Sequence, residues 1–477
     1  MELHVAHSLN LIDDNKTLHI IRCNGLIKYC TLNPFGRKAI CASCRIKAQA
    51  LIDHVHTISN KVNVISIDEN IRTEGCQKVS EDIYTVLKNA VLSGIASHTR
   101  ISEEKYLSLK WINSKHDIQD AAIKQHKALS RIIKIHSIDE LYCFNGRFSC
   151  SKAAIYAASV NKINYIVYDL NRGFNHYSFR NKSLHSISEN TKRAVDLYNK
   201  DPTMAEKTAD TFYKRKRLNL KTYEESYTKS QKKGLVTFDE KLQIVSIFTS
   251  SDDEYRYIGS DWGEGTVVVD QIEEIKVLID GLNDKYNIIV RMHPNQGGMP
   301  RRMLDIYNRE LSHRCKLVLP ASKIDTYEIM DRSDYVVTFC SLIGPEAIYA
   351  DKKLVTIGSS PYVKLNIGIN VSNGFLAAKV IVSGKSKMDK NGAIIWANYL
   401  MSYNDKLPGF INHGNGNCSI YGINFISYRS RSIALLVAKT ELFFLKSNGL
   451  SLRTVKNMIQ RVISFLDGKV RGEHEIK

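Results

Sequence analysis

The sequence predicts an α/β protein with two Rossmann-like domains that face each other across a cleft. The first observation is the length of 477 residues, about three times the usual ~150-residue domain, which favours two large domains over one. The second is the alternation of short β-branched runs with helical periodicity from about residue 235, which is typical of a parallel sheet covered by helices. The third is a weaker form of this alternation in the N-terminal half.

The C-terminal half contains the clearer alternation. Asp270 and Asp325 each begin an expected helix, and each has a glutamate three residues later, which is the pattern of a capping box. Pro345 suits the start of a further helix over residues 346–350, because a missing N–H costs nothing at a first helical position. The expected strands cover residues 243–248, 287–292, 316–319, 335–340 and 354–357.

The N-terminal half is expected to form a second α/β domain. Its predicted strands cover residues 18–23, 62–67, 141–144 and 165–168, and a helix is predicted at 152–160. A helix-like segment covers residues 2–11. We predict a Rossmann-like domain with the cysteine cluster at 1–190, a basic linker at 191–234, a second Rossmann-like domain at 235–425 and a C-terminal helical segment at 426–477, with its amphipathic helix at about 428–466.

The chain is strongly basic, with 67 Lys and Arg against 49 Asp and Glu, a formal net charge of +18. This balance favours anionic partners, namely nucleic acid, phosphorylated substrates or an acidic membrane face. The run Lys214-Arg215-Lys216-Arg217 in the linker has two interpretations, a solvated helix or a contact with an anionic surface or phosphate. An apolar content of 43% excludes a fibrous or mainly disordered protein.

Neither a membrane span nor a signal peptide is predicted. The most apolar window, residues 433–445, contains Lys439 and Glu441, and the first residues lack the basic and apolar regions of a secretory signal. We therefore expect a cytoplasmic protein, with peripheral attachment to the inner face of the plasma membrane as an additional possibility that its positive charge would favour.

Polar residues follow three successive strands of the predicted C-terminal sheet. In open α/β sheets, ligands bind at the carboxyl ends of the strands, so these residues form the candidate donor site. Gly344 would let backbone approach a phosphate, Ser341 would donate a hydroxyl, and Glu346 would accept hydrogen bonds from a ribose. His293 would stabilise the departing phosphate charge. The candidate donor-binding residues are Ser250, Ser251, His293, Asn295, Ser341, Gly344 and Glu346.

Two of these residues also have purely structural interpretations. Glu346 is in the first turn of its helix, where a carboxylate can simply complement the helix dipole. His293 precedes a proline at the end of a strand, where a histidine can be a satisfied structural residue.

Four cysteines near the N-terminus form a second constellation, Cys23, Cys30, Cys41 and Cys44. Four thiolates can bind Zn²⁺ tetrahedrally, and the Cys41-Ala42-Ser43-Cys44 spacing is that of a zinc knuckle. A structural zinc site is one interpretation, preferred over an iron–sulfur cluster. The other is a set of reduced thiols, with Cys23 ending a buried strand.

Several motifs together resemble one family. The run from Val245 to Glu254, Arg291-Met292-His293-Pro294-Asn295 and Cys340-Ser341-Leu342-Ile343-Gly344-Pro345-Glu346-Ala347 are similar to bacterial capsule and surface-polysaccharide biosynthesis glycosyltransferases, which include the Kdo-transferase-like capsule proteins. Phe144-Asn145-Gly146-Arg147-Phe148 and Tyr168-Asp169 are similar to the N-domain pattern of this group, so that the resemblance covers roughly residues 20 to 375.

The resemblance implies a GT-B architecture, with the nucleotide donor on the C-terminal domain, the acceptor on the N-terminal one and no catalytic metal. By this analogy His293 and Ser341 would contact the donor phosphate and Glu346 the ribose. No cofactor is expected for catalysis.

An inverting transfer also needs a base for the acceptor hydroxyl. Asp169 is the first candidate, ahead of Asp252 and Asp253, although the family often has an acidic residue followed by Arg-Gly where this chain has Leu170-Asn171-Arg172-Gly173 after Asp169. Asn145 and Arg147 are candidate acceptor- or anion-binding residues, and a structural ion pair is the alternative for Arg147.

The predicted function is transfer of a sugar from a nucleotide-activated donor to a capsular or lipopolysaccharide-type glycan, or to its lipid-linked form. One alternative is a CDP-glycerol-type polyol-phosphate transferase, and another is a catalytically silent relative. A third is a basic nucleic-acid-binding protein with a four-cysteine zinc site. Nucleic acid is not the expected partner, because the positive charge is spread along the chain and no complete zinc-finger or aromatic RNA-binding signature is present.

Overall fold

The structure is a computed structural model that divides into two compact units. Unit 1 comprises residues 1–78, 116–138 and 407–477, and unit 2 comprises residues 79–115 and 139–406. The residues that the structure describes are 17–56, 61–71, 79–171, 176–220, 222, 228–237, 241–263, 270–282, 285–402, 405–406, 410–414, 417–420 and 423–425. The helices predicted at 2–11 and 428–466 lie outside the described residues. The predicted domain boundaries stay predictions.

A six-stranded parallel sheet forms the centre of unit 2, in the order β11-β10-β9-β6-β7-β8. Its strands are β6 (Gln243–Phe248), β7 (Tyr286–Arg291), β8 (Lys316–Val318), β9 (Tyr335–Thr338), β10 (Lys353–Ile357) and β11 (Ile369–Val371). The first five are the strands predicted from the sequence, and the α/β class is confirmed. The chain changes direction across the sheet between β6 and β9, and such a switch point is where open sheets bind ligands.

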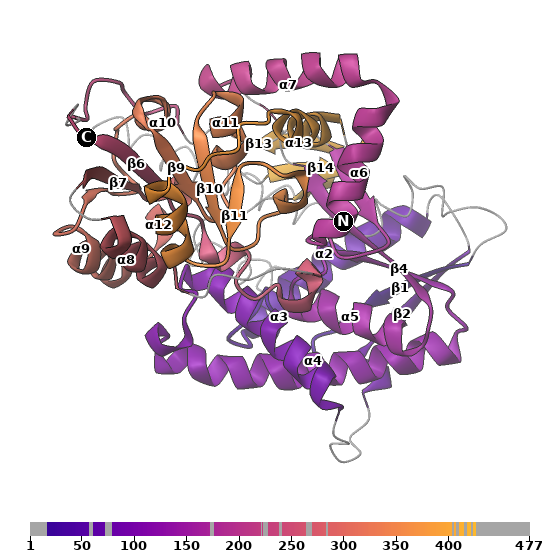
Figure 1. The fold of residues 1–477 in the computed structure, drawn as a ribbon. Coiled ribbons are helices and arrows are strands. Elements are labelled where there is room, and N and C mark those ends of the chain that lie inside the picture. Colours follow the sequence, from indigo (N-terminus) through magenta and orange to yellow (C-terminus); the bar gives the residue numbers. More distant parts are fainter. Residues whose placement is uncertain are drawn as a thin grey trace, which may run out of the picture. The chain divides into compact units, whose positions relative to one another are not determined.

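Helices cover both faces of this sheet, because successive strand residues point to opposite sides. Val245 and Ile247 pack with one group of helices, and Ile244 and Phe248 pack with the other. The first group is α8 (Gln271–Leu282), α9 (Arg301–Leu311) and α12 (Gly374–Val382), and the second is α7 (Pro202–Arg217), α10 (Thr326–Arg332), α11 (Ile343–Tyr349) and α13 (Asn391–Ser402). Figure 1 shows the three helices of the first group together on one side.

The basic segment that the sequence analysis treats as a linker is largely helical. It contains most of α6 (Ile187–Lys200) and all of α7, and both helices pack against α13. Phe212 and Tyr213 of α7 are buried in the core, and the Tyr213 hydroxyl donates to the Ala393 carbonyl at 2.8 Å. This segment therefore contributes to the core of unit 2 in addition to connecting the two halves of the chain.

The strands predicted in the N-terminal half all form, but they divide between two sheets. In unit 2, β3 (Glu140–Phe144) and β4 (Asn164–Asn171) are parallel neighbours, and β5 (His176–Arg180) and β12 (Asp405–Lys406) complete the order β12-β5-β4-β3. Helix α5 (Ser149–Val160) packs on β3 and β4, and α3 (Glu81–Thr99) packs on α5. In unit 1, β1 (Leu18–Arg22) pairs in parallel with β2 (Val62–Ser66), beside α2 (Lys38–His56).

The remaining elements are short or lie at the margins of the units. They are α4 (Leu109–Ile135), a three-stranded antiparallel sheet of β13 (Phe410–Gly414), β14 (Asn417–Ile420) and β15 (Ile423–Phe425), and the 3₁₀ turns η1 (Asp68–Asn70), η2 (Glu104–Tyr106), η3 (Asp252–Glu254), η4 (Gly259–Trp262), η6 (Pro294–Gly298) and η7 (Val363–Leu365). No helix in the described part of the chain has the length and apolar character needed to cross a membrane.

Candidate active site

A cavity of about 350 Å³ lies in unit 2 at the carboxyl ends of β6, β7 and β9. Its position agrees with the switch point of the six-stranded sheet, where the loops after neighbouring strands diverge. Of the seven predicted donor-binding residues, six line it, namely Ser250, Ser251, His293, Asn295, Ser341 and Glu346. The sequence pattern therefore located one wall of a real cavity.

His293 is held in one orientation and one protonation state. Its ring Nδ1 accepts the backbone N–H of Asn295 at 3.1 Å. The backbone N–H of His293 donates to the Gln296 side chain at 2.9 Å, and together these two bonds cap η6. Burial, reinforced by nearby cationic side chains, lowers the pKa of His293 to about 4. The ring is neutral near pH 7 and, because Nδ1 is an acceptor, its proton is on Nε2. A neutral N–H donor of this kind suits a phosphate oxygen.

Two of the three serines in the cavity wall accept backbone N–H groups and so stabilise the loops after the strands. Ser250 accepts the Cys340 N–H at 2.9 Å, and Ser341 accepts the Ile343 N–H at 3.3 Å. The Ser251 hydroxyl is buried and has no hydrogen-bond partner among the described residues. Ser251 is therefore the serine of this group whose hydrogen-bonding capacity is left for a ligand.

Glu346 is buried and engaged by two residues that the sequence analysis did not assign to the site. The Tyr327 hydroxyl donates to its carboxylate at 2.7 Å, and Lys216 Nζ lies 3.8 Å from the other oxygen. Lys216 comes from α7, in the basic run of the segment predicted as a linker. The phosphate-contact interpretation of that run was the available signal for Lys216, but nothing local in the sequence connects it with Glu346.

Arg291 supplies a second positive charge to the cavity. Its guanidinium is buried, donates to the carbonyls of Leu319 and Ser322 at 3.0 and 3.4 Å, and leaves Nε without a partner. It forms no ion pair among the residues that the structure describes, and burial lowers its pKa to about 10. The Asp325 carboxylate attracts this charge without forming an ion pair with it, and burial outweighs that attraction, so the arrangement favours an anionic ligand.

Gly344 lies behind the cavity wall. A Cβ at this position would lie 2.6 Å from the Tyr362 hydroxyl, and that hydroxyl donates to the Ser341 carbonyl at 2.5 Å. The glycine thus allows Tyr362 to pack closely against the start of α11.

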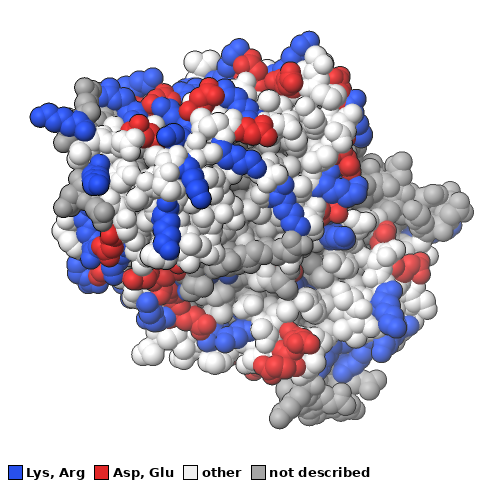
Figure 2. All heavy atoms as spheres, viewed as in Figure 1, with Lys and Arg blue, Asp and Glu red and all other residues white. Residues whose placement is uncertain are grey.

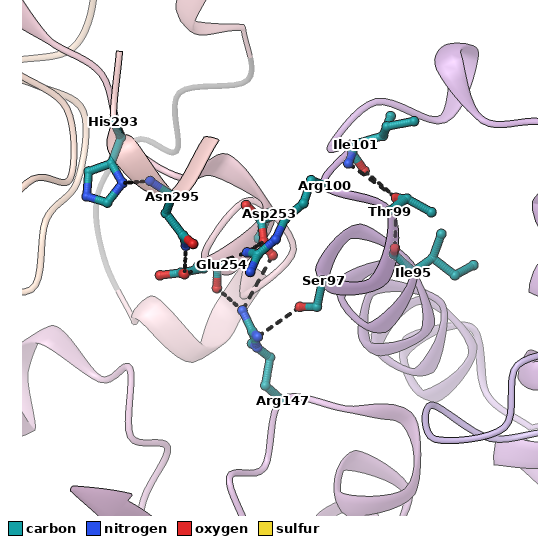
Figure 3. A network of polar contacts seen from close by, with 10 residues as sticks. All are labelled: Ile95, Ser97, Thr99, Arg100, Ile101, Arg147, Asp253, Glu254, His293 and Asn295. Carbon is teal, nitrogen blue, oxygen red and sulfur yellow. Dashed lines mark hydrogen bonds and ion pairs between the residues drawn. The ribbon is translucent and has the colours of Figure 1, made fainter. Parts of the chain in front are cut away.

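A network of polar contacts joins η3 to α3 and to the loop before α5 (Figure 3). Arg100 forms an ion pair with Asp253, and Arg147 donates to the Glu254 carbonyl and, at 3.0 Å, to the Ser97 hydroxyl. The Glu254 carboxylate accepts the Asn295 side-chain N–H at 2.7 Å, and Asn295 in turn fixes His293. The hydrogen-bond partners of Arg147 are therefore backbone carbonyl and hydroxyl oxygens, and these contacts do not test the ion-pair interpretation from the sequence. Glu254 connects Arg147 with the loop that carries His293.

The predicted base candidates have different environments. Asp169 accepts the Asn145 side-chain N–H at 2.8 Å and is not among the residues lining the cavity. Asp253 is paired with Arg100. Asp252 is buried against Tyr255, and burial raises its pKa to about 7. The carboxylates that do line the cavity are Glu254 and Glu346, and Glu254 was part of the predicted polar run without an assigned role.

The four N-terminal cysteines lie in unit 1, with Cys41 and Cys44 on the first turns of α2. The Cys23 thiol accepts the Gly25 N–H at 3.3 Å, and burial raises its pKa to about 11. Within the described ranges, no three His, Cys, Asp or Glu side chains are grouped so that they could hold a metal ion. The structural zinc site stays a prediction.

Comparison with known proteins supports the resemblance predicted from the sequence. Residues 147–368 match the family model of the capsule polysaccharide biosynthesis proteins. The match spans somewhat less than half of the chain and includes all the cavity residues from the ends of β6, β7 and β9. None of the curated proteins matches the chain significantly.

Three solved structures that are similar to this chain are distant from it in sequence. The β-Kdo 2,7 transferase of Thermosulfurimonas dismutans KpsC is 14% identical, with 63% of this chain and 90% of that chain covered and a TM-score of 0.37. Its β-Kdo 2,4 transferase is 12% identical, with 55% and 79% covered and a TM-score of 0.36. The Neisseria meningitidis UDP-GlcNAc 2-epimerase bound to UDP-GlcNAc is 10% identical, with 80% and 98% covered and a TM-score of 0.25.

Proposed function

We propose that this protein is a metal-independent glycosyltransferase that moves a sugar from a nucleotide-activated donor to a surface glycan, or to its lipid-linked form. The observation that carries the proposal is the cationic cavity at the carboxyl ends of β6, β7 and β9, within the segment that matches the capsule family. A facing arrangement of two Rossmann-like domains is part of this proposal.

The donor phosphate would be held by the residues that bring positive charge or an N–H to the cavity. Arg291 and Lys216 would neutralise its charge, and the Nε2–H of His293 would donate to an oxygen of the leaving group. Preorganised donors of this kind stabilise charge that develops on the leaving phosphate as the glycosidic bond breaks. Glu346, held by Tyr327, would accept hydrogen bonds from the ribose hydroxyls.

A carboxylate would accept the proton of the attacking hydroxyl. Asp169 remains the candidate from the family resemblance, and Glu254 is a candidate from its place in the cavity wall. The variants Asp169→Asn and Glu254→Gln preserve shape and hydrogen bonding, so loss of the base should reduce kcat by roughly 10²- to 10⁴-fold with little change in nucleotide affinity. The variant that shows this loss identifies the base.

Calorimetric titration with CMP, CDP, UDP and GDP tests the donor site. His293→Asn retains a side-chain oxygen that can cap η6 but removes the Nε2–H. We expect one nucleotide to bind selectively, and its Kd to rise about 10- to 100-fold in His293→Asn, as for loss of a hydrogen bond to a charged group. His313→Asn, which changes an exposed histidine on the same unit, is the matched control and should bind like the wild type.

Other results would redirect the proposal. A folded wild type that binds none of the four nucleotides would contradict it and favour a silent relative. Binding of CDP combined with transfer only from CDP-polyols would favour a polyol-phosphate transferase. Oligonucleotide binding with a steep salt dependence would favour a nucleic-acid partner. On the face shown in Figure 2, however, basic and acidic side chains are interspersed.

A further inference from the structure

One part of the cavity wall differs from the cationic part. It contains His185, Tyr255, Ile258 and Trp262, which come from the loop before α6, η3 and the residues around η4. The rings of His185 and Trp262 are neighbours, with centroids 6.3 Å apart at an angle of 57°. This region is largely aromatic and apolar, and its four side chains carry four polar atoms.

Two of those polar atoms are buried and have no partner among the described residues. They are Trp262 Nε1 and His185 Nε2. Trp262 is only 4% exposed, because it packs in a cluster with Ile187 and Ile258. Leaving such a group unsatisfied is costly, so buried polar atoms at a cavity usually have a ligand or water as their partner.

This region carries no unpaired charge. Burial, followed by the nearby cations Arg147 and Lys152, lowers the pKa of His185 to about 3, so its ring is neutral. Arg147 donates to the Glu254 carbonyl and to Ser97, and Lys152 forms an ion pair with Asp261. The contrast with Arg291 and Lys216 indicates an uncharged part of the ligand.

A hydroxyl group fits the two unsatisfied atoms better than a pure acceptor. The indole N–H can only donate, whereas a neutral imidazole nitrogen donates or accepts according to its tautomer. A hydroxyl both accepts and donates, so it satisfies either tautomer. Trp262 is almost fully buried in its cluster, which leaves little of its ring for stacking of a nucleobase.

We propose that His185 and Trp262 form a subsite for the hydroxyl groups of a sugar ring. This inference rests on the proposed function for its place beside a nucleotide site. The sugar has two possible sources, the transferred residue of the donor and the terminal residue of the acceptor, and both present the same chemistry.

The test uses the full chain with Trp262→Phe and, separately, His185→Phe. Each variant keeps a ring and removes the polar atom. Trp111→Phe is the matched control, because Trp111 stacks on His98 outside the cavity. Thermal unfolding of all three variants shows whether they are folded. If Trp262→Phe is not folded, His185→Phe tests the proposal.

Binding is measured with matched pairs of probes: CMP with CMP-N-acetylneuraminate, and UDP with UDP-N-acetylglucosamine. If the subsite holds the donor sugar, the Kd of a nucleotide sugar should rise about 3- to 10-fold in each variant, the loss of one neutral hydrogen bond, and that of the nucleotide alone should stay within 2-fold. If it holds the acceptor sugar, saturation-transfer NMR with N-acetylglucosamine, galactose and Kdo should lose its signal in the variants.

Several outcomes would overturn the inference. An equal loss of affinity for the nucleotide alone would make this part of the wall a nucleobase pocket. Unchanged binding of every sugar-bearing probe, or no binding of any of them to the wild type, would also refute a sugar subsite. If the nucleotides fail to bind but free sugars bind and depend on Trp262, the proposed donor site fails while the sugar subsite holds.

Discussion

The cavity wall and the network of Figure 3 use buried cations in opposite ways. In the network, Arg100 is paired with Asp253, and Arg147 is anchored to the Glu254 carbonyl and Ser97. In the cavity, Arg291 is more deeply buried, at 2% exposure against 31% for the Arg100 side chain, and forms no ion pair among the described residues. A paired cation holds two chain segments together, whereas an unpaired one is stabilised only when a ligand supplies the negative charge. The presence or absence of a protein partner for the cation therefore distinguishes a structural contact from a binding site within unit 2.

The sharpest test of this comparison is Arg291→Met. Removing the unpaired guanidinium should raise the Kd of the selected nucleotide about 10- to 100-fold, since hydrogen bonds to charged groups contribute roughly 1.5–3 kcal/mol. Calorimetry measures the Kd, and urea denaturation should show a change of less than about 2 kcal/mol in the free energy of unfolding. A large fall in the free energy of unfolding with an unchanged nucleotide Kd would show that Arg291 has a structural role and is not part of the binding site.

Arg147→Met should give the opposite pattern. The free energy of unfolding should fall by about 2 kcal/mol, because the Glu254 carbonyl and the Ser97 hydroxyl lose their charged donor. The nucleotide Kd should stay within about 3-fold of the wild type, a difference well under 1 kcal/mol. If affinity for an anionic donor or acceptor collapses while stability is unchanged, then Arg147 is a ligand contact, the other interpretation of this residue.

Lys216→Met and Lys214→Met compare two lysines of one helix. Lys216 lines the cavity, and Lys214 is exposed and paired with Asp210 on the same helix. We expect the nucleotide Kd to rise about 3- to 10-fold for Lys216→Met, as for the loss of a partly screened charge interaction, and not to change measurably for Lys214→Met. Equal effects from both would indicate a long-range contribution of the basic helix.

The smallest expected effect is on pH dependence. The pKa of His293 is about 4 in the folded protein and near 6.5 when unfolded, so the unfolded state binds more protons between these values. Its contribution to stability is therefore present above pH 6.5 and is lost as the pH falls towards 4. Between pH 7 and 5.5, wild type should lose about 1 kcal/mol more stability than His293→Asn in urea denaturation. Parallel pH profiles would contradict the neutral, buried ring.

The parts of the fold that could be predicted from sequence are those determined locally. The run at 243–248 is apolar and β-branched, and β6 has the same limits. The polar residues after β6, β7 and β9 could be assigned to one site because parallel strands bring their carboxyl ends to one edge. In the N-terminal half, the strands were also recognisable, but strand pairing is non-local, and their division between two sheets has no local signature.

The residues that the sequence did not reveal enter the site from distant segments. Lys216 reaches Glu346 because α7 and α11, which carry these two residues, both pack against α13, and these helices are far apart in the chain. His185 and Trp262 become neighbours only through tertiary packing. Single histidines and tryptophans are also common core residues, so no spacing rule distinguishes these two.

We expect the residues of η3 to tolerate few substitutions. Asp253 ties the turn to Arg100, and Glu254 uses its carbonyl for Arg147 and its carboxylate for Asn295. A substitution at Glu254 disturbs the loop that carries His293, and one at Asp253 disturbs the contact with Arg100 at the end of α3. In a deep mutational scan that selects for nucleotide binding, we expect tolerance at 253 and 254 to be as low as at His293 itself, although neither residue is required to touch the nucleotide.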